Sequence, residues 1–135
     1  MSIVYVVQEP LHRVGREVEW RIPRRDLEAF GTIVCLCKWG ELRDDGDGDF
    51  SPSRSAELWH KIRVKLRTFG DADYIVPLGN PALIAMATLI AADVNGGRVS
   101  MLDWVRDASA YRIIPIDAHC QPSSARDLAR TRPSR

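Results

Sequence analysis

The turn at residues 78–81, Leu-Gly-Asn-Pro, holds the residues whose types and spacing best suit the binding of an anion. The run at 73–79 predicts a strand that ends at this turn, and Asn80 followed by Pro81 predicts the start of a helix. Unpaired N–H groups in the first turn of a helix attract anions. Because Pro81 has no N–H and Asn80 is expected to cap another donor, the sequence predicts only a weak anion site, at Gly79 and Asn80.

This turn leads to one functional hypothesis, a small ligand-binding protein or enzyme with its site at residues 78–81. The hypothesis requires a deep pocket at the end of the strand, lined by Asn80 and a nearby His or Asp. A flat, closed surface at that position would exclude it.

Cysteine and histidine side chains could ligate a metal ion or act as nucleophiles, and the chain has three of each: Cys35, Cys37, Cys120, His12, His60 and His119. Cys35 and Cys37 are expected on one face of a strand, but zinc and redox sites prefer the C-x-x-C spacing. We interpret both as small core residues, although a composite site with His119 and Cys120 can be drawn. The odd number of cysteines argues against a disulfide framework and favours a reducing compartment.

Recognised catalytic motifs are absent from the sequence. There is no G-x-S-x-G nucleophile elbow, no G-x-x-x-x-G-K phosphate loop and no dinucleotide fingerprint. A Ser-His or Cys-His pair that meets only in space stays open as an alternative. The sequence therefore favours a non-enzymatic protein without a cofactor, and it leaves catalytic activity undecided.

Four aspartates with two glycines form a loop that could suggest calcium binding: Asp44, Asp45, Asp47 and Asp49. A calcium loop places Gly at its sixth position and Glu at its twelfth. Counted from Asp45, these positions are Phe50 and Ala56, so the pattern fails. A solvated acidic loop is the interpretation, and no metal site is predicted.

The clearest helix, at about 53–69, has a basic outer side. Its apolar residues recur at steps of three and four, and Trp59 lies about 100° from that stripe, so we expect it to reach the surface. Basic residues line the polar flanks, and with Trp59 they are the predicted partner-binding set: Lys61, Arg63, Lys65 and Arg67. The alternative is an ordinary solvated helix face.

The charges are unevenly distributed along a chain whose formal net charge is +1. Residues 121–135 contain four arginines and one aspartate, whereas the first 120 residues contain 15 basic and 17 acidic groups. The low net charge argues against a protein dedicated to coating nucleic acid. A nucleic-acid-binding module that uses the long helix and the basic tail is nevertheless an alternative function, and it predicts binding that weakens steeply with salt.

Strand and helix patterns alternate through the middle of the chain, which predicts an α/β fold with a mixed sheet, with α+β as the alternative. We expect about five to six strands and two main helices. The expected strands cover 2–7, 17–22, 32–39 and 73–79; the helices cover 23–31, 53–69 and 80–94; and 98–105 with 110–117 form a closing β-hairpin. The predicted domain is 1–118, followed by a basic, disordered tail at 119–135.

The uncharged core of the helix at 80–94 spans residues 82–92 and is too short for a bilayer, which needs about 20 residues. We therefore expect no membrane contact. Instead, we expect the helix at 80–94 to be buried, with one side packed on the sheet and the other side covered as well. A helix whose outer face meets another protein is the alternative. The N-terminus shows no signal peptide, so the expected location is the cytoplasm.

Two stretches, at 26–37 and 58–117, resemble small proteins encoded in tailed-phage and prophage genomes. The similarity covers about half the chain and consists of caps, turns and core positions. The chain departs from the pattern at Asn80, where Asp is expected, and at Val105. The matching positions are Gly79, Asn80, Pro81, Asn95, Gly96, Leu102, Trp104 and Tyr111. The resemblance implies a phage protein of unknown function, working in the cytoplasm of an infected bacterium.

The leading hypothesis is a non-enzymatic, phage-type accessory protein that binds a host or viral protein, in a takeover or inhibitor role. It rests on the missing catalytic motifs, on four tryptophans in a short chain and on the resemblance. A homodimer is an additional expectation, because a mixed sheet with an open edge can pair two copies.

Overall fold

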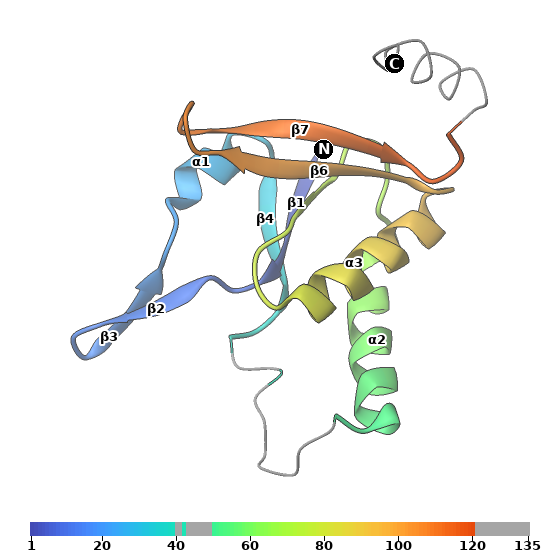
Figure 1. Ribbon diagram of the computed structural model, residues 1–135, viewed down its shortest axis with the longest axis horizontal. Helices are drawn as coiled ribbons and strands as arrows, with labels where there is room; N and C mark the ends of the chain where they lie inside the picture. The colour runs from blue at the N-terminus through green and yellow to red at the C-terminus, as the bar shows by residue number, and fades with distance from the viewer. Residues whose placement is uncertain (40–41, 43–49, 121–135) are drawn as a thin grey trace, which may run out of the picture.

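A computed structural model describes residues 1–39, 42 and 50–120, which form a five-stranded sheet, a separate two-stranded ribbon and three helices (Figure 1). In chain order the elements are β1 (Ile3–Gln8), β2 (Leu11–Val14), β3 (Glu17–Trp20), α1 (Arg24–Glu28), β4 (Thr32–Cys37), α2 (Pro52–Leu66), β5 (Tyr74–Val76), α3 (Pro81–Val94), β6 (Arg98–Val105) and β7 (Ala110–Asp117). Residues 121–135 of the basic tail predicted at 119–135, and most of the acidic loop, lie outside the described residues.

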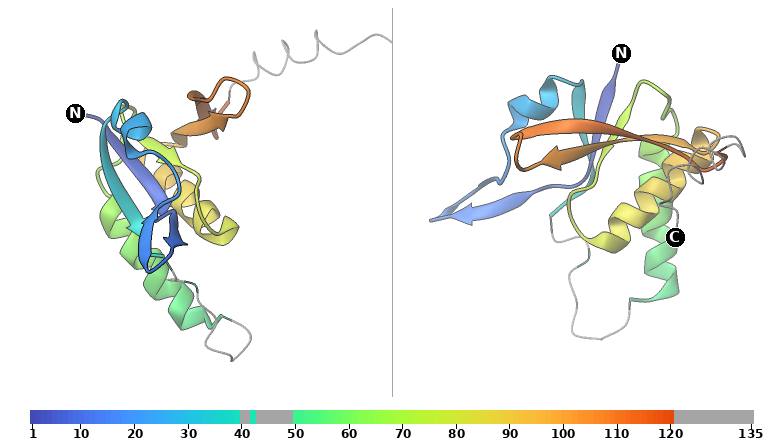
Figure 2. Two further views of the ribbon diagram at one scale, coloured as in Figure 1. Left: turned by 90° about the vertical axis from the view of Figure 1, so that its left-hand side faces the viewer. Right: turned by 45° about the horizontal axis from the view of Figure 1, so that its top comes forward.

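The strand order in the large sheet is β4-β1-β5-β6-β7. The first four strands are parallel, and β7 returns antiparallel to β6 as the second strand of the closing hairpin. The chain first steps from β1 to β4 and then passes back to β5, so right-handed crossovers place α1 on one face and α2 with α3 on the other (Figure 2). The α/β prediction with a mixed sheet is confirmed.

The larger core lies between the sheet and the pair α2 and α3. Alternate residues of β1, Tyr5 and Val7, point into it, because successive strand side chains face opposite sides. The helices contribute buried residues at helical spacing: Leu58, Ile62, Leu66, Leu83, Ala87 and Ile90. Both helices begin at capping residues: Arg54 N–H donates to Ser51 Oγ (3.2 Å), and Ala82 N–H donates to Oδ1 of Asn80 (2.8 Å), the cap that the sequence predicted.

The smaller core lies under α1 on the opposite face. Val4 and Val6 of β1 pack there with Leu27 of α1, and Val76 and Leu102 complete the buried set. The single short helix α1 covers less of this face than α2 and α3 cover of the other (Figures 1 and 2). Half-buried aromatic residues pack around its rim: Trp20, Phe30, Tyr74 and Tyr111.

The segment 17–22 was expected to be a half-buried strand, and this expectation is only partly met. Residues 17–20 form β3, but β3 pairs with β2 in an arm that projects from the body, and Val18 is exposed (Figure 1). β2 is not among the strands expected from the sequence. Its signal is the two-residue turn Gly15-Arg16, in which Gly15 adopts a positive φ of 64°, as tight hairpin turns require.

The expectation that α3 is covered on both sides is wrong. Ala87 and Ile90 are buried against the sheet and α2, but Leu89 is 62% exposed on the outer side. A helix that is rich in alanine, as α3 is, can be apolar on most of its surface without a second layer of structure covering it. Among the described residues, no helix is long and apolar enough to cross a membrane.

Candidate functional site

A crevice of about 430 Å³ opens at the carboxyl ends of β1, β4 and β5. The chain that leaves β1 continues to the α1 face, and the chain that leaves β5 continues into α3 on the other face, so the adjacent strand ends diverge. Doubly wound sheets bind ligands at such a switch point. The crevice is lined mainly by strand ends and by the base of the arm, including Gln8, Glu9, Arg21, Trp39, Leu78 and Gly79.

Gly79 allows the ends of β1 and β5 to approach closely. The N–H of Gln8 donates to the Leu78 carbonyl (3.1 Å), and the Gln8 side-chain oxygen accepts from Asn80 N–H (2.9 Å). Gly79 has a φ of 115°, and a Cβ added there would lie 2.6 Å from that same Gln8 oxygen. Any side chain at this position would therefore disturb both the backbone and the bridge that Gln8 makes to α3.

The predicted anion site at Gly79 and Asn80 lies beside this crevice, with Gly79 in its wall. Asn80 is engaged at two atoms: its N–H donates to Gln8, and its side-chain oxygen accepts from Ala82 N–H. The polar side chains of the wall include Gln8 and Glu9 in place of the His or Asp that the hypothesis required. The anion site stays a prediction.

The charged wall residues are held by backbone hydrogen bonds. Glu9 N–H donates to the Cys37 carbonyl (3.0 Å), which ties the end of β1 to the end of β4. Arg21 N–H donates to the Pro10 carbonyl (2.7 Å), which ties the base of the arm to the same region. Glu9 and Arg21 thus line the crevice from segments whose main chain is fixed, together with Trp39, which is 45% exposed.

Cys35 lies close enough to the crevice for its thiol to be influenced by Glu9. Burial raises the pKa of the Cys35 thiol, and the carboxylate of Glu9 raises this pKa further. A thiol is nucleophilic only as the thiolate, which both effects disfavour. The arrangement therefore argues against Cys35 as a nucleophile.

The two cysteines of β4, which were expected on one face, belong to different core clusters. Cys35 packs with the cluster under α1, and Cys37 belongs to the buried cluster under α2 and α3. Cys37 is the last residue of β4 and pairs with Gln8 of β1. Within the described ranges 1–39, 42 and 50–120, no group of three or more His, Cys, Asp or Glu side chains could hold a metal ion.

The basic set predicted to bind a partner lies on α2, and two of its members already contact other elements. The Lys65 ammonium donates to the carbonyls of Leu36 (2.9 Å) and Cys35 (3.3 Å) on the edge strand β4. The Arg63 guanidinium pairs with Asp93 of α3 at 2.9 Å. Their heads are exposed, but a partner would compete with these contacts.

The remaining members of the set lie along the same helix. Lys61 borders a small depression beside Phe50, and Arg67 is exposed at the end of α2. Trp59 was expected to be the tryptophan that reaches the surface, but it is half-buried against the larger core. The most exposed tryptophans are Trp39 and Trp104. Partner binding by this helix face stays a prediction.

The outer hairpin carries large apolar side chains at the surface. Trp104 of β6 is 44% exposed and Ile113 of β7 is 49% exposed; both lie on the α1 side of the sheet, since Ile113 pairs with buried Leu102. Trp104 stacks edge-on against Tyr111 with ring centroids 5.0 Å apart. Ile116 is exposed on the opposite side of the same edge strand.

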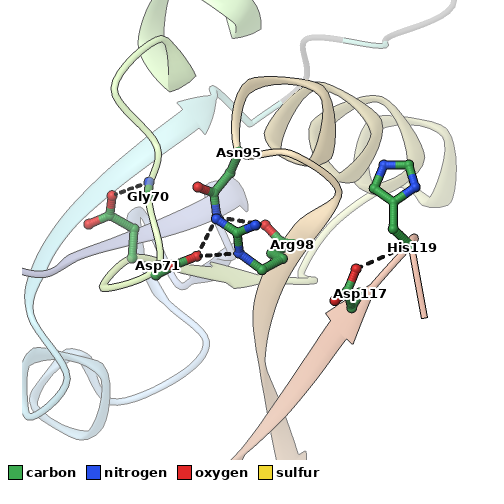
Figure 3. Close-up of polar contacts among 7 residues, drawn as sticks. Gly70, Asp71, Asn95, Arg98, Asp117 and His119 are labelled. Carbon is green, nitrogen blue, oxygen red and sulfur yellow. Dashed lines mark hydrogen bonds and ion pairs between the residues drawn. The ribbon is translucent and has the colours of Figure 1, made fainter. Parts of the chain in front are cut away.

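Polar residues at the amino end of β6 form a compact network (Figure 3). Asp71 Oδ1 accepts from the Asn95 amide (2.8 Å) and from the Arg98 guanidinium (3.0 Å). The hydrogen bond from Asn95, followed by that from Arg98, lowers the pKa of the Asp71 carboxyl. The His119 N–H donates to Asp117 beside this network (2.9 Å). The network links α3, β6 and the turn before β5, which is a structural role.

Apart from Gly79, sequence reasoning missed the residues that line the crevice, although a signal was present for two of them. Glu9 follows the first apolar strand, and Trp39 is the last residue of the third predicted strand. Carboxyl ends of parallel strands meet at one edge of a sheet, so these positions could have been grouped once the strands were assumed to be parallel. Arg21 carries no such signal, because its place depends on the arm.

The comparisons with known proteins identify a phage family. The family model described as Phage Pam3 gp32-like protein matches residues 2–118, so the chain belongs to this family. The resemblance to phage proteins that the sequence indicated is thereby confirmed. No curated protein and no solved structure matches the chain.

Proposed function

Since the chain belongs to a phage family, we propose that it is a non-enzymatic accessory protein that binds another protein in the cytoplasm of an infected bacterium. The partner is a host or phage protein, and the binding surface is the β6–β7 hairpin. The observation that carries the proposal is the exposure of Trp104 on β6 and Ile113 on the edge strand β7, which are diagonal neighbours on the same side of the hairpin. Contiguous apolar groups at a surface are typical of interaction sites.

The aromatic residues of this surface are held in place. Trp104 packs on Tyr111, and Tyr111 packs on Phe30 next to α1, with centroids 6.4 Å apart. An immobilised aromatic side chain loses little conformational entropy on binding, and tryptophan and tyrosine dominate the energetics of many interfaces. The hairpin therefore offers a preformed apolar anchor.

The edge of β7 favours a different protein over a second copy of this chain as the partner. Two copies could join their sheets by pairing β7 with β7, but Pro115 in the middle of this strand has no N–H to give. A partner that docks on the side chains of the hairpin does not need those backbone donors. We therefore assign the surface to side-chain recognition, and the homodimer becomes an outcome to be tested.

The test compares capture by the tagged wild-type protein and by the double variant Trp104→Ser, Ile113→Ser from nuclease-treated lysates of uninfected and infected bacteria. Val64→Ser is the control, because Val64 is an exposed apolar residue of α2 far along the chain from the hairpin. We expect one protein retained by the wild type and by Val64→Ser and lost with the double variant, with all three melting cooperatively.

Three results would contradict the proposal. The first is a captured protein that the double variant retains. The second is capture that disappears when nucleic acid is digested, which would favour the basic side of α2 and the tail. The third is a stable dimer by sedimentation equilibrium that the double variant abolishes, since the hairpin would then be a self-association surface.

A further inference from the structure

The crevice at the carboxyl ends of β1, β4 and β5 has the make-up of a small-molecule site that is separate from the hairpin surface. Its volume of about 430 Å³ lies within the range of about 300–1,000 Å³ found for ligand pockets. It lies at the switch point of the sheet, where the strand ends diverge and leave space without any distortion of the fold. We propose that this crevice binds a guanine mononucleotide.

Trp39 supplies the surface on which a flat ring can stack. Trp39 lines the crevice and is 45% exposed. Leu11, Ile22 and Leu78 add apolar wall on the sides. Purine rings stack well on aromatic side chains, and this attraction does not depend on hydrogen bonding.

Glu9 selects among flat rings because a carboxylate only accepts hydrogen bonds. Guanine presents two adjacent N–H groups on its pairing edge, which one carboxylate can accept together, whereas adenine presents a ring nitrogen acceptor at the central position of that edge. A carboxylate therefore attracts guanine and repels adenine at the same place. Glu9 is half-buried, which strengthens this discrimination relative to open water.

Arg21 supplies the cation for a phosphate. It lies in the same wall as Glu9 but comes from the base of the arm, so the two charges belong to different segments. A guanidinium binds phosphate oxygens in a two-pronged geometry. A base recognised by Glu9 and a phosphate held by Arg21 together describe a nucleoside monophosphate.

A free nucleotide fits better than a nucleic-acid strand. The first 120 residues carry 15 basic and 17 acidic groups, so the body of the protein has no excess of cations with which to follow a phosphate backbone. The crevice is also bounded by the close contact of Gly79 with Gln8, which fixes its width at the β5 side. A crevice of about 430 Å³ matches one small ligand better than a chain of nucleotides.

The experiment is isothermal titration calorimetry of the full chain with GMP, AMP and guanosine at constant ionic strength. We expect GMP to bind at least about tenfold more tightly than AMP. Glu9→Gln should remove most of that difference, Trp39→Ala should weaken GMP and guanosine alike, and Arg21→Ala should weaken GMP but not guanosine.

Two variants serve as matched controls, Arg25→Ala for Arg21 and Glu28→Gln for Glu9. Both residues are exposed on α1, outside the crevice, and both variants should bind GMP as the wild type does. Circular dichroism melts establish that every variant is folded. The proposal is overturned by the absence of saturable heat with GMP at concentrations up to about 1 mM, by equal binding of AMP, or by GMP binding that Trp39→Ala and Glu9→Gln leave intact.

Discussion

At the amino end of the sheet the acidic residues accept hydrogen bonds from the chain itself, whereas at the carboxyl end Glu9 and Arg21 line an open crevice. Asp73, only 6% exposed, accepts from Ile3 N–H (2.9 Å) and from Gly70 N–H (2.9 Å). Asp73 is thus used for hydrogen bonds within the fold, whereas Glu9 and Arg21 line the crevice in which we propose that a ligand binds. The amino end is closed by its own side chains, and the carboxyl end is framed mainly by backbone.

The largest effect should come from Asp73, whose replacement tests the closed end. Asp73→Ala leaves two backbone N–H groups without their charged acceptor, so we expect a loss of about 3 kcal/mol in the free energy of unfolding. Urea unfolding followed by circular dichroism measures it. Asp71→Ala is the control, because Asp71 is exposed, and it should lose clearly less. Equal losses for the two variants would mean that burial of the carboxylate does not matter at this end.

Gly79→Ala probes the frame of the open end. A positive φ and the overlap with Gln8 should together destabilise the protein by about 1–3 kcal/mol. Gly70→Ala is the matched control, since a Cβ there meets nothing within 4 Å and should change stability by no more than about 0.5 kcal/mol. Thermal melts of both variants decide the point, and an unchanged melting temperature for Gly79→Ala would show that the close approach is not required.

The charged residues that line the crevice should hardly affect stability. Glu9→Gln and Arg21→Ala remove charges that the described structure does not use to hold its core, so we expect changes within about 0.5 kcal/mol. Chemical unfolding under the conditions used for Asp73→Ala measures them. A loss as large as that of Asp73→Ala would erase the contrast between the two ends.

The smallest effect concerns pH and the Asp71 network. Because hydrogen bonds from Asn95 and Arg98 lower the pKa of Asp71 in the folded chain, its contribution is fully present above the ordinary aspartate pKa of about 4. That contribution is lost as the pH falls through the lowered folded value. The wild type should therefore exceed Asp71→Asn in stability at neutral pH, and the gap should close in acid. A gap independent of pH would exclude a charge effect.

The pattern of strands and helices was predictable because each element has its own local signal. The β6–β7 hairpin was predicted with the bounds that the structure shows, since its turn is polar and its strands are apolar. The caps Ser51 and Asn80 were predictable for the same reason. These features depend on neighbours within a few residues, which a sequence displays directly.

The candidate sites were less predictable because they depend on strand order. Whether Glu9 and Trp39 lie together follows from β4 pairing with β1, and no local signal specifies that pairing. The exposure of a side chain is equally hard to predict from local sequence, because it depends on which elements pack over it. Trp59 has the spacing of a surface residue but lies beside the larger core, and Trp104 has the pattern of a strand residue but no layer covers it in the described structure.

The contact of Lys65 with the edge strand β4 has a consequence for behaviour at high concentration. An edge strand with unpaired backbone groups is a template for strand addition, which is how soluble proteins begin to form cross-β aggregates. The ammonium of Lys65 binds two carbonyls of β4 and would have to be stripped of water and displaced before a foreign strand could pair there. Acylation of Lys65, which removes its charge, should therefore shorten the lag time before a concentrated solution aggregates, as measured by turbidity.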